Sequence, residues 1–245
     1  MKYLFTFILI LFSPALIQAG LPQSDEFFAK ADQFFQKHVE NGRIDYANIK
    51  KNPAELMALT SQIAETNLES KSASYIKAFL TNAYNILIIK QVIENYPVQG
   101  PMAINGFFDK TKYKVAGNDL TLNQLEKGWL YQEFPDPRLH FALVCAAVGC
   151  PPIAGFAFQP EQLNQQLNEV TTMALNDEEF VRVDEGKKKV LLSQIFNWYK
   201  KDFLKEADSL LEFVNQYRKK PFGKDYKTGY YEYDWSLNDV RNSGS

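Results

Sequence analysis

The sequence predicts an α+β domain in which several helices pack on a small, mainly antiparallel sheet. The strongest helical pattern covers residues 72–96, SASYIKAFLTNAYNILIIKQVIENY, where apolar residues recur at helical spacing and Pro97 follows. Two strand-like runs, 180–184 and 189–192, are joined by a short turn that ends in Gly186, which is the pattern of a hairpin.

The N-terminal half is predicted to be mostly helical. Apolar residues at helical spacing indicate a helix over residues 24–42, which ends in a glycine. Residues 43–49 alternate enough to form a short extended segment, and a proline in the first turn begins a second helix over 53–64. After the long helix, residues 113–116 read as a strand, and Gly117-Asn118-Asp119 read as the turn that follows it.

The C-terminal half adds helices around the hairpin. Thr121 and Gln124 form a capping-box pattern that opens a helix reaching about Leu130. Helical spacing also predicts helices over residues 160–176, 193–204 and 209–218. The closing stretch GYYEYDWSLND reads as an aromatic strand. Because no repeat, low-complexity region or linker interrupts the pattern, we expect one domain over residues 20–245.

The first residues carry the features of a secretory signal peptide. Lys2 precedes an apolar run over residues 3–12, and a break at Ser13-Pro14 is followed by the small residue Ala19. We predict cleavage after Ala19, which removes residues 1–19 and exports the protein to the periplasm or the exterior of a bacterium. The alternative is an uncleaved membrane anchor, for which the apolar run is short. No other stretch of the sequence is predicted to span a membrane.

The stretch RLHFALVCAAVGCPP concentrates the reactive side chains. It holds both cysteines, Cys145 and Cys150, and His140, one of two histidines. The apolar run over residues 141–144 predicts a buried strand with His140 near its start and the cysteines in a turn at its far end. An oxidising compartment favours a disulfide between two cysteines, and Gly149 would allow the turn that this bridge requires.

Two asparagines interrupt the apolar neighbourhood of the long helix. Asn82 and Asn85 are three residues apart and therefore share one face. Buried asparagines need hydrogen-bond partners. They either tie the helix to the backbone of a neighbouring loop, or they orient or polarise a group in a functional site.

Five stretches between about residues 75 and 238 read, in order, FLTNAYNILII, YKVAGNDLTLNQLEKGWL, RLHFALVCAAVGCPP, LLSQIFNWYKKDF and YDWSLN. In this order they resemble the bacterial branch of the domain of unknown function 547 family. The resemblance implies a candidate site made of Glu126, His140 and Cys145. The family often carries a histidine directly after this glutamate, where this chain has Lys127. The pattern is also similar to papain-like and transglutaminase-like folds, an analogy that does not define function.

These three residue types suit a cysteine-dependent hydrolase or acyltransferase acting on an amide or ester bond. Cys145 would be the nucleophile, His140 its base and Glu126 the group that orients the base. Asn82 and Asn85 would shape the substrate-binding part of the site. Residues five apart point to opposite faces of a regular strand. A direct pair of His140 and Cys145 therefore requires a bulge or turn between them.

Two other interpretations remain open. His140, Cys145 and Cys150 offer three zinc ligands, but the spacing H-x4-C-x4-C matches no common zinc arrangement, and we expect neither a metal nor a cofactor. In a non-enzymatic binding module the two cysteines would be bridged, and aromatic residues would form a groove for a small molecule, a peptide or a glycan. The net charge of −2 argues against a nucleic-acid partner. We expect a monomer.

Overall fold

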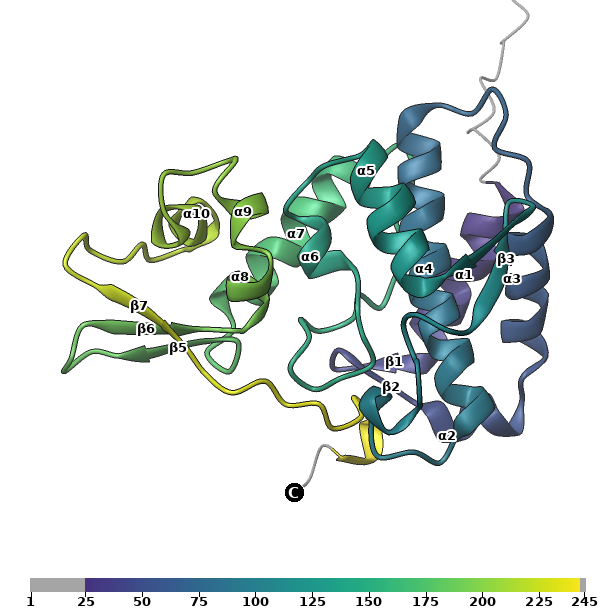
Figure 1. The fold of residues 1–245 in the computed structure, drawn as a ribbon, viewed down its shortest axis with the longest axis horizontal. Helices are drawn as coiled ribbons and strands as arrows, with labels where there is room; N and C mark the ends of the chain where they lie inside the picture. Colours follow the sequence, from purple (N-terminus) through teal and green to yellow (C-terminus); the bar gives the residue numbers. More distant parts are fainter. Residues whose placement is uncertain (1–24, 243–245) are drawn as a thin grey trace, which may run out of the picture.

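A computed structural model describes residues 25–242, so the predicted signal peptide lies outside the described residues (Figure 1). The α-helices are α1 (Glu26–His38), α2 (Tyr46–Lys51), α3 (Ala54–Glu65), α4 (Ala73–Asn95), α5 (Tyr131–Glu133), α6 (Leu139–Ala142), α7 (Leu163–Asn176), α8 (Ile195–Trp198), α9 (Lys200–Phe203) and α10 (Leu210–Tyr217). Two short 3-10 helices, η1 (Pro101–Ala103) and η3 (Val240–Asn242), and one π-helix, η2 (Gln124–Leu130), complete the helical part. The strands are β1 (Val39–Glu40), β2 (Arg43–Ile44), β3 (Lys112–Val115), β4 (Asn118–Thr121), β5 (Val181–Asp184), β6 (Lys189–Leu192) and β7 (Lys227–Tyr230).

The α+β class is confirmed, and the strands lie in three small sheets. β1 pairs with β2 and β3 pairs with β4, both antiparallel, while the third sheet has the order β5–β6–β7. The predicted hairpin is formed by antiparallel β5 and β6, whereas β7 adds to β6 in parallel. Between β3 and β4 the turn is made by Ala116 and Gly117, at φ +46° and +80°. Asn118 and Asp119, predicted in this turn, instead begin β4.

Helix α4 lies at the centre of the fold. It begins and ends close to the predicted positions, with the Ser72 hydroxyl accepting a hydrogen bond from the Tyr75 N–H at 3.2 Å. It packs against α2, α3 and η2, and nearly all of residues 78–93 are buried. A helix that is apolar on most of its faces has to lie inside the core, because no face suits water. The length and position of α4 therefore follow directly from its sequence.

The segment that leads to the cysteines departs from the predicted elements. The predicted strand over residues 141–144 is wrong, because Leu139–Ala142 form α6 and the chain extends only after it. The Val144 N–H donates to Oδ1 of Asn85 at 3.0 Å, and Nδ2 of Asn85 donates to the Ala142 carbonyl at 2.9 Å. A short apolar run does not distinguish a strand from a buried helical turn. Here an asparagine of α4 supplies the backbone partners that a neighbouring strand would otherwise supply.

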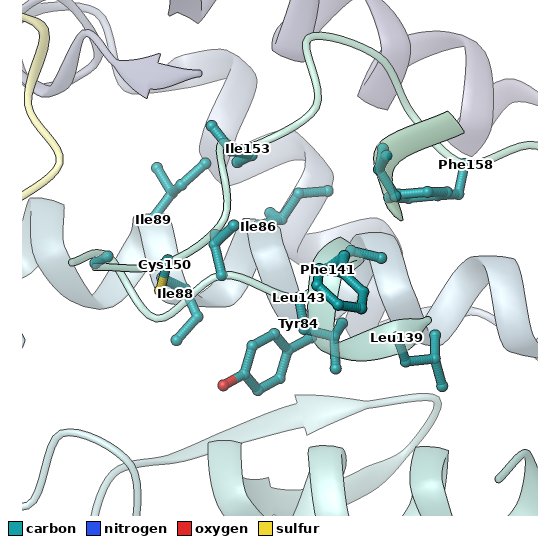
Figure 2. Close-up of a cluster of buried hydrophobic side chains, with 14 of the residues drawn as sticks. Tyr84, Ile86, Ile88, Ile89, Leu139, Phe141, Leu143, Cys150, Ile153 and Phe158 are labelled. Atoms are coloured by element: carbon teal, nitrogen blue, oxygen red, sulfur yellow. The ribbon is translucent and has the colours of Figure 1, made fainter. Parts of the chain in front are cut away.

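The core joins this segment to α4. Figure 2 shows Ile86 and Ile88 of α4 together with Phe141, Leu143 and Cys150 of the segment that crosses it. All five side chains are buried. Burying an aliphatic or aromatic side chain of this size contributes about 1.5–3 kcal/mol. The position of Cys150 is therefore determined by the core as well as by its local turn.

Two predicted helices differ from the structure: one ends earlier and the other is divided in two. The helix predicted over residues 24–42 ends at His38, because Val39–Glu40 and Arg43–Ile44 pair as a small hairpin. Its turn consists of Asn41 and Gly42, both at positive φ. The helix predicted over residues 193–204 is divided into α8 and α9 at Tyr199.

The C-terminal tail, residues 231–242, runs back from β7 to the opposite side of the molecule (Figure 1). Of the predicted closing strand, only the part within β7 belongs to the sheet. Further along, Leu237 forms an isolated bridge with Ala147, and Asp239 forms one with Ile44. The tail thus connects β2, the last sheet and the stretch over residues 143–150, which we call the cysteine segment. None of the helices between residues 25 and 242 combines the length and hydrophobicity needed to cross a membrane.

Candidate functional site

A pocket of about 410 Å³ brings together the three residues that the family resemblance implies. Glu126, His140 and Cys145 all contribute to its walls. The other lining residues are Tyr84, Phe108, Asn123, Lys127, Leu143, Val144, Cys150, Ile195, Trp198, Tyr199, Tyr233 and Trp235. Together with the first three, they come from α4, the loop before β3, η2 and the residue before it, α6, the cysteine segment, α8 and the residue after it, and the C-terminal tail. The pocket therefore depends on segments that are far apart in the sequence.

Glu126 is a buried carboxyl held by two phenols. It lies in η2, and π-helical turns of this kind are often found at functional sites. The hydroxyl of Tyr84 donates to Oε2 at 3.0 Å, and the hydroxyl of Tyr199 donates to Oε1 at 3.2 Å. Burial raises the pKa of Glu126, although the charge of Lys127 and the two tyrosines act in the opposite direction. The capping box that opens this turn is confirmed, because Thr121 and Gln124 exchange hydrogen bonds as predicted.

His140 is buried between aromatic rings and contacts a carboxylate that the sequence interpretation missed. Its ring stacks on Tyr131 with centroids 4.6 Å apart and lies 4.0 Å from the ring centroid of Tyr199. Nε2 is 3.2 Å from Oδ2 of Asp202 on α9. Burial lowers the pKa of His140 to about 4, against the raising effect of Asp202. The imidazole is therefore neutral at pH 7, with Nε2–H donating to the carboxylate and Nδ1 carrying the lone pair.

The carboxylate that contacts His140 belongs to Asp202, and not to Glu126 as the sequence predicts. Burial raises its pKa, but hydrogen bonds from Lys205 and His140 outweigh this effect, and the net pKa is lowered. No hydrogen bond joins Glu126 to His140 in the part of the chain that the structure describes; Tyr199 contacts both instead. Asp202 lies within the stretch LLSQIFNWYKKDF, and no feature of its local pattern distinguishes it from other exposed helical acids. Only its contact with a histidine 62 residues away reveals it.

Cys145 and Cys150, the only cysteines of the chain, are joined by a disulfide. The hydroxyl of Tyr233 lies 3.0 Å from Sγ of Cys145 and 3.1 Å from Sγ of Cys150. The N–H of Cys145 also donates to Sγ of Cys150 at 2.9 Å. In the turn between the two cysteines, Ala146 takes a left-handed backbone conformation at φ +62°.

Gly149 contributes to this turn in a different way from that predicted. Its backbone is not left-handed, so it does not supply the expected conformational freedom. A Cβ at this position would come within 2.9 Å of the Tyr233 ring and 3.0 Å of the Asp234 nitrogen. The glycine is needed because the tail approaches the cysteine segment closely, and the N–H of Gly149 donates to the Asp234 carbonyl at 2.9 Å.

Asn82 and Asn85 lie behind the pocket and do not line it. Asn82 donates to the carbonyls of Ala78 and Phe158 and accepts from the Phe158 N–H. Asn85 holds the backbone on either side of Leu143. Both amides are occupied by backbone groups, which matches the first of the two predicted roles, that of tying the helix to a loop.

One wall of the pocket is aromatic. Trp198, Tyr233 and Trp235 contact one another, with the two indole rings 5.8 Å apart at an angle of 24°. Trp198 is 49% exposed, which is high for a tryptophan in a folded domain. Between residues 25 and 242 no group of histidine, cysteine, aspartate and glutamate side chains is arranged to hold a metal ion.

The fold and the pocket define an α+β domain with a disulfide, a histidine–aspartate pair and a buried glutamate around one aromatic cavity. Residues 68–173 match the sequence model of the family described as "Protein of unknown function, DUF547". The predicted resemblance is thereby confirmed, and the matched segment contains Glu126, His140 and both cysteines. No curated protein and no solved structure matches the chain. The likeness to papain-like and transglutaminase-like folds stays a prediction.

Proposed function

We propose that the reduced protein is a cysteine-dependent hydrolase or acyltransferase acting on an amide or ester bond. The observation that carries the proposal is the convergence of Cys145, His140 and Glu126 on one pocket. Burial moves the pKa of the acid up and that of the histidine down. Such opposed shifts are typical of groups that exchange protons in catalysis.

The proposed roles follow from the chemistry of the side chains that line the pocket; among the described residues no hydrogen bond joins His140 to Cys145, so the substrate-bound state would have to bring them together. After reduction of the disulfide, the Cys145 thiol gives its proton to Nδ1 of His140, and the thiolate attacks the carbonyl carbon of the substrate. The bond to the leaving nitrogen or oxygen breaks, and the imidazolium returns the proton to the leaving group. Asp202 takes the orienting role through Nε2. Glu126 accepts hydrogen bonds from its two tyrosines, and burial raises its pKa; in its protonated form it would donate a hydrogen bond to developing negative charge.

Export is part of the same proposal. A disulfide persists in oxidising compartments and is rare in the cytosol. The Cys145–Cys150 bridge therefore supports a periplasmic or secreted location, and we propose that the chain reaches it after cleavage behind Ala19. Mass measurement of the chain recovered from the culture medium or periplasm tests this location. A chain retained in the cytoplasm with Met1 in place would contradict it.

An acylation assay with the wild type and three variants tests the catalytic roles. We expect the reduced wild type to release one equivalent of leaving group from an activated ester in a rapid burst, and Cys145→Ser to release none. Cys150→Ser leaves Cys145 unbridged and should react without reductant. His140→Gln should lower the burst rate by about 10²–10⁴. Equal rates for Cys145→Ser and the reduced wild type would exclude the proposal.

A second candidate function is non-enzymatic binding of a small molecule, peptide or glycan, and the disulfide together with the exposed Trp198 wall favours it. A bridged cysteine has no thiolate and cannot act as a nucleophile. The flat face of an indole is a good surface on which a ring of a ligand can stack. Titration of the oxidised protein with a ligand panel, followed by tryptophan fluorescence, tests this function. Saturable binding without acylation by the reduced protein would select binding over catalysis.

A further inference from the structure

The two sulfurs of the disulfide differ in their surroundings. Both line the pocket, but Cys150 is buried at 8% exposure whereas Cys145 is partly exposed. A thiolate that enters the pocket therefore reaches Cys145 more easily. Access is one of the factors that decide which sulfur of a disulfide is attacked.

Hydrogen bonds favour Cys150 as the sulfur that leaves. Its Sγ accepts from the Cys145 N–H at 2.9 Å and from the Tyr233 hydroxyl at 3.1 Å. Donors aimed at a sulfur stabilise the thiolate, and a more stable thiolate leaves faster. Tyr233 also lies 3.0 Å from Sγ of Cys145, but a phenol has one proton and donates to one sulfur at a time. Within residues 25–242, a second donor, the Cys145 N–H, reaches Sγ of Cys150 and none reaches Sγ of Cys145.

We infer that the disulfide is a redox-active site, in which a dithiol reductant attacks Sγ of Cys145 through the pocket and displaces Cys150 as a thiolate held by Tyr233 and the Cys145 N–H. The incoming thiolate forms a mixed disulfide with Cys145 as the Cys145–Cys150 bond breaks. The second thiol of the reductant, after losing its proton, attacks the reductant's own sulfur in that mixed disulfide and releases Cys145 as a thiolate. The reductant becomes a disulfide, and two electrons pass to the protein.

A dithiol is the fitting class of reductant. Once a mixed disulfide has formed, the Cys150 thiolate is five residues away in the same turn and re-attacks at high effective concentration. A monothiol is expelled by this reaction, whereas a dithiol resolves the intermediate within one molecule. The inference goes beyond the proposed function and does not depend on it, because disulfide exchange is followed without any ester or amide.

The test uses the full oxidised protein. We expect brief treatment with glutathione, an acid quench and peptide mapping to locate the trapped adduct on Cys145. We expect Tyr233→Phe to be reduced by dithiothreitol about tenfold more slowly than wild type, since it loses a hydrogen bond to a charged sulfur. Tyr231→Phe is the matched control, because the Tyr231 hydroxyl donates to the Phe180 carbonyl and not to a sulfur. Its rate should equal that of the wild type.

Two results would overturn the inference. One is an adduct on Cys150, which also lines a smaller pocket of about 170 Å³ on another face of the cysteine segment. The other is a Tyr233→Phe protein that keeps its thermal unfolding transition yet is reduced as fast as Tyr231→Phe. The Cys150→Ser protein provides a further check with oxidised glutathione. The free Cys145 thiolate should attack its disulfide, release one glutathione thiolate and keep a stable mixed disulfide, because no Cys150 thiolate is present to expel it. Failure of that adduct to form would contradict access to Cys145, whatever the outcome of the acylation assay.

Discussion

Burial shifts the pKa values of Glu126 and His140 in opposite directions, and both shifts link the pocket to the stability of the fold. It raises the pKa of Glu126 and lowers that of His140. An unfolded chain binds protons at ordinary pKa values. Between pH 4 and 6.5 the unfolded state therefore takes up a proton on His140 that the folded state does not bind.

The first prediction concerns this histidine. The contribution of His140 is fully present above pH 6.5 and is lost as the pH falls towards 4, because its folded pKa is depressed. We expect the wild type to lose about 3 kcal/mol more than His140→Gln between pH 7 and pH 4. Urea unfolding of both proteins across this range measures the difference, in which the titration of Glu126 cancels. Parallel curves would contradict the assignment of the low pKa to His140.

The second prediction concerns Asn85. Asn85→Ala removes both hydrogen bonds that hold the backbone before Cys145 and leaves buried partners unsatisfied. We expect a loss of about 2–4 kcal/mol in the free energy of unfolding, and faster reduction of the disulfide by dithiothreitol. Asn82→Ala is the control, because it breaks contacts to Phe158 and not to the cysteine segment. It should lose stability and keep the wild-type reduction rate; equal acceleration in both variants would argue against a specific role for Asn85.

Sequence reasoning reached some of these residues and missed others for a physical reason. Glu126, His140 and Cys145 were identified through a family motif, and the structure brings them to one pocket. Asp202 and Tyr233 were missed because their importance lies in contacts with residues 62 and 83–88 positions away. No local pattern encodes such a contact. Aspartates and tyrosines of this kind are also common outside functional sites.

At the scale of elements, long periodic patterns predict the structure correctly, whereas short apolar runs do not. Helix α4 and the β5–β6 hairpin were predictable because each carries its own repeated pattern and end signals. The four apolar residues 141–144 were misassigned as a strand because a tertiary partner, Asn85, decides their conformation. The tail was predicted as a strand, but most of it is held by single bridges to separate segments.

The third prediction tests how the tail docks. A Cβ on Gly100 would lie 2.1 Å from the Trp235 carbonyl oxygen, which is backbone and cannot rotate away. Gly100→Ala should therefore displace the tail, weaken the bond from the Leu237 N–H to the Gln99 carbonyl, and change the tryptophan fluorescence of the pocket wall. Gly128→Ala is the matched control, with nothing within 4 Å of its Cβ. It should leave the fluorescence unchanged; identical spectra for the two variants would exclude tight docking at Gly100.

At the scale of the whole molecule, the disulfide links residues that are close in the sequence, whereas the tail contacts residues that are far from it in the sequence. The bridge joins residues five positions apart, so it restricts the unfolded chain only slightly. The tail instead joins distant parts: the Tyr46 hydroxyl donates to Oδ1 of Asn238 at 2.8 Å, across 192 residues of sequence. The Tyr96 hydroxyl donates to Asp239 on the same side of the molecule. These contacts, more than the disulfide, hold the tail to α2 and to the residue that follows α4.

The fourth prediction follows from this contrast. Reduction of the disulfide should lower the free energy of unfolding by about 2 kcal/mol and leave the protein folded. Urea unfolding with and without dithiothreitol, followed by circular dichroism, measures the change. The double variant Cys145→Ser, Cys150→Ser should resemble the reduced protein. Cooperative unfolding on reduction alone would show that the bridge supports the fold more broadly than its short turn implies.

The position of the tail also has a consequence for biosynthesis. Tyr233, which helps to complete the aromatic wall, leaves the ribosome 88 residues after Cys145. A nascent chain can therefore build α4 and its surroundings but has neither the closed pocket nor the phenol beside its sulfurs. Cysteines that are oxidised before Tyr233 has been synthesised therefore form their bridge on an open turn. The finished site forms only when residues 233–238 have been made and have packed along the cysteine segment.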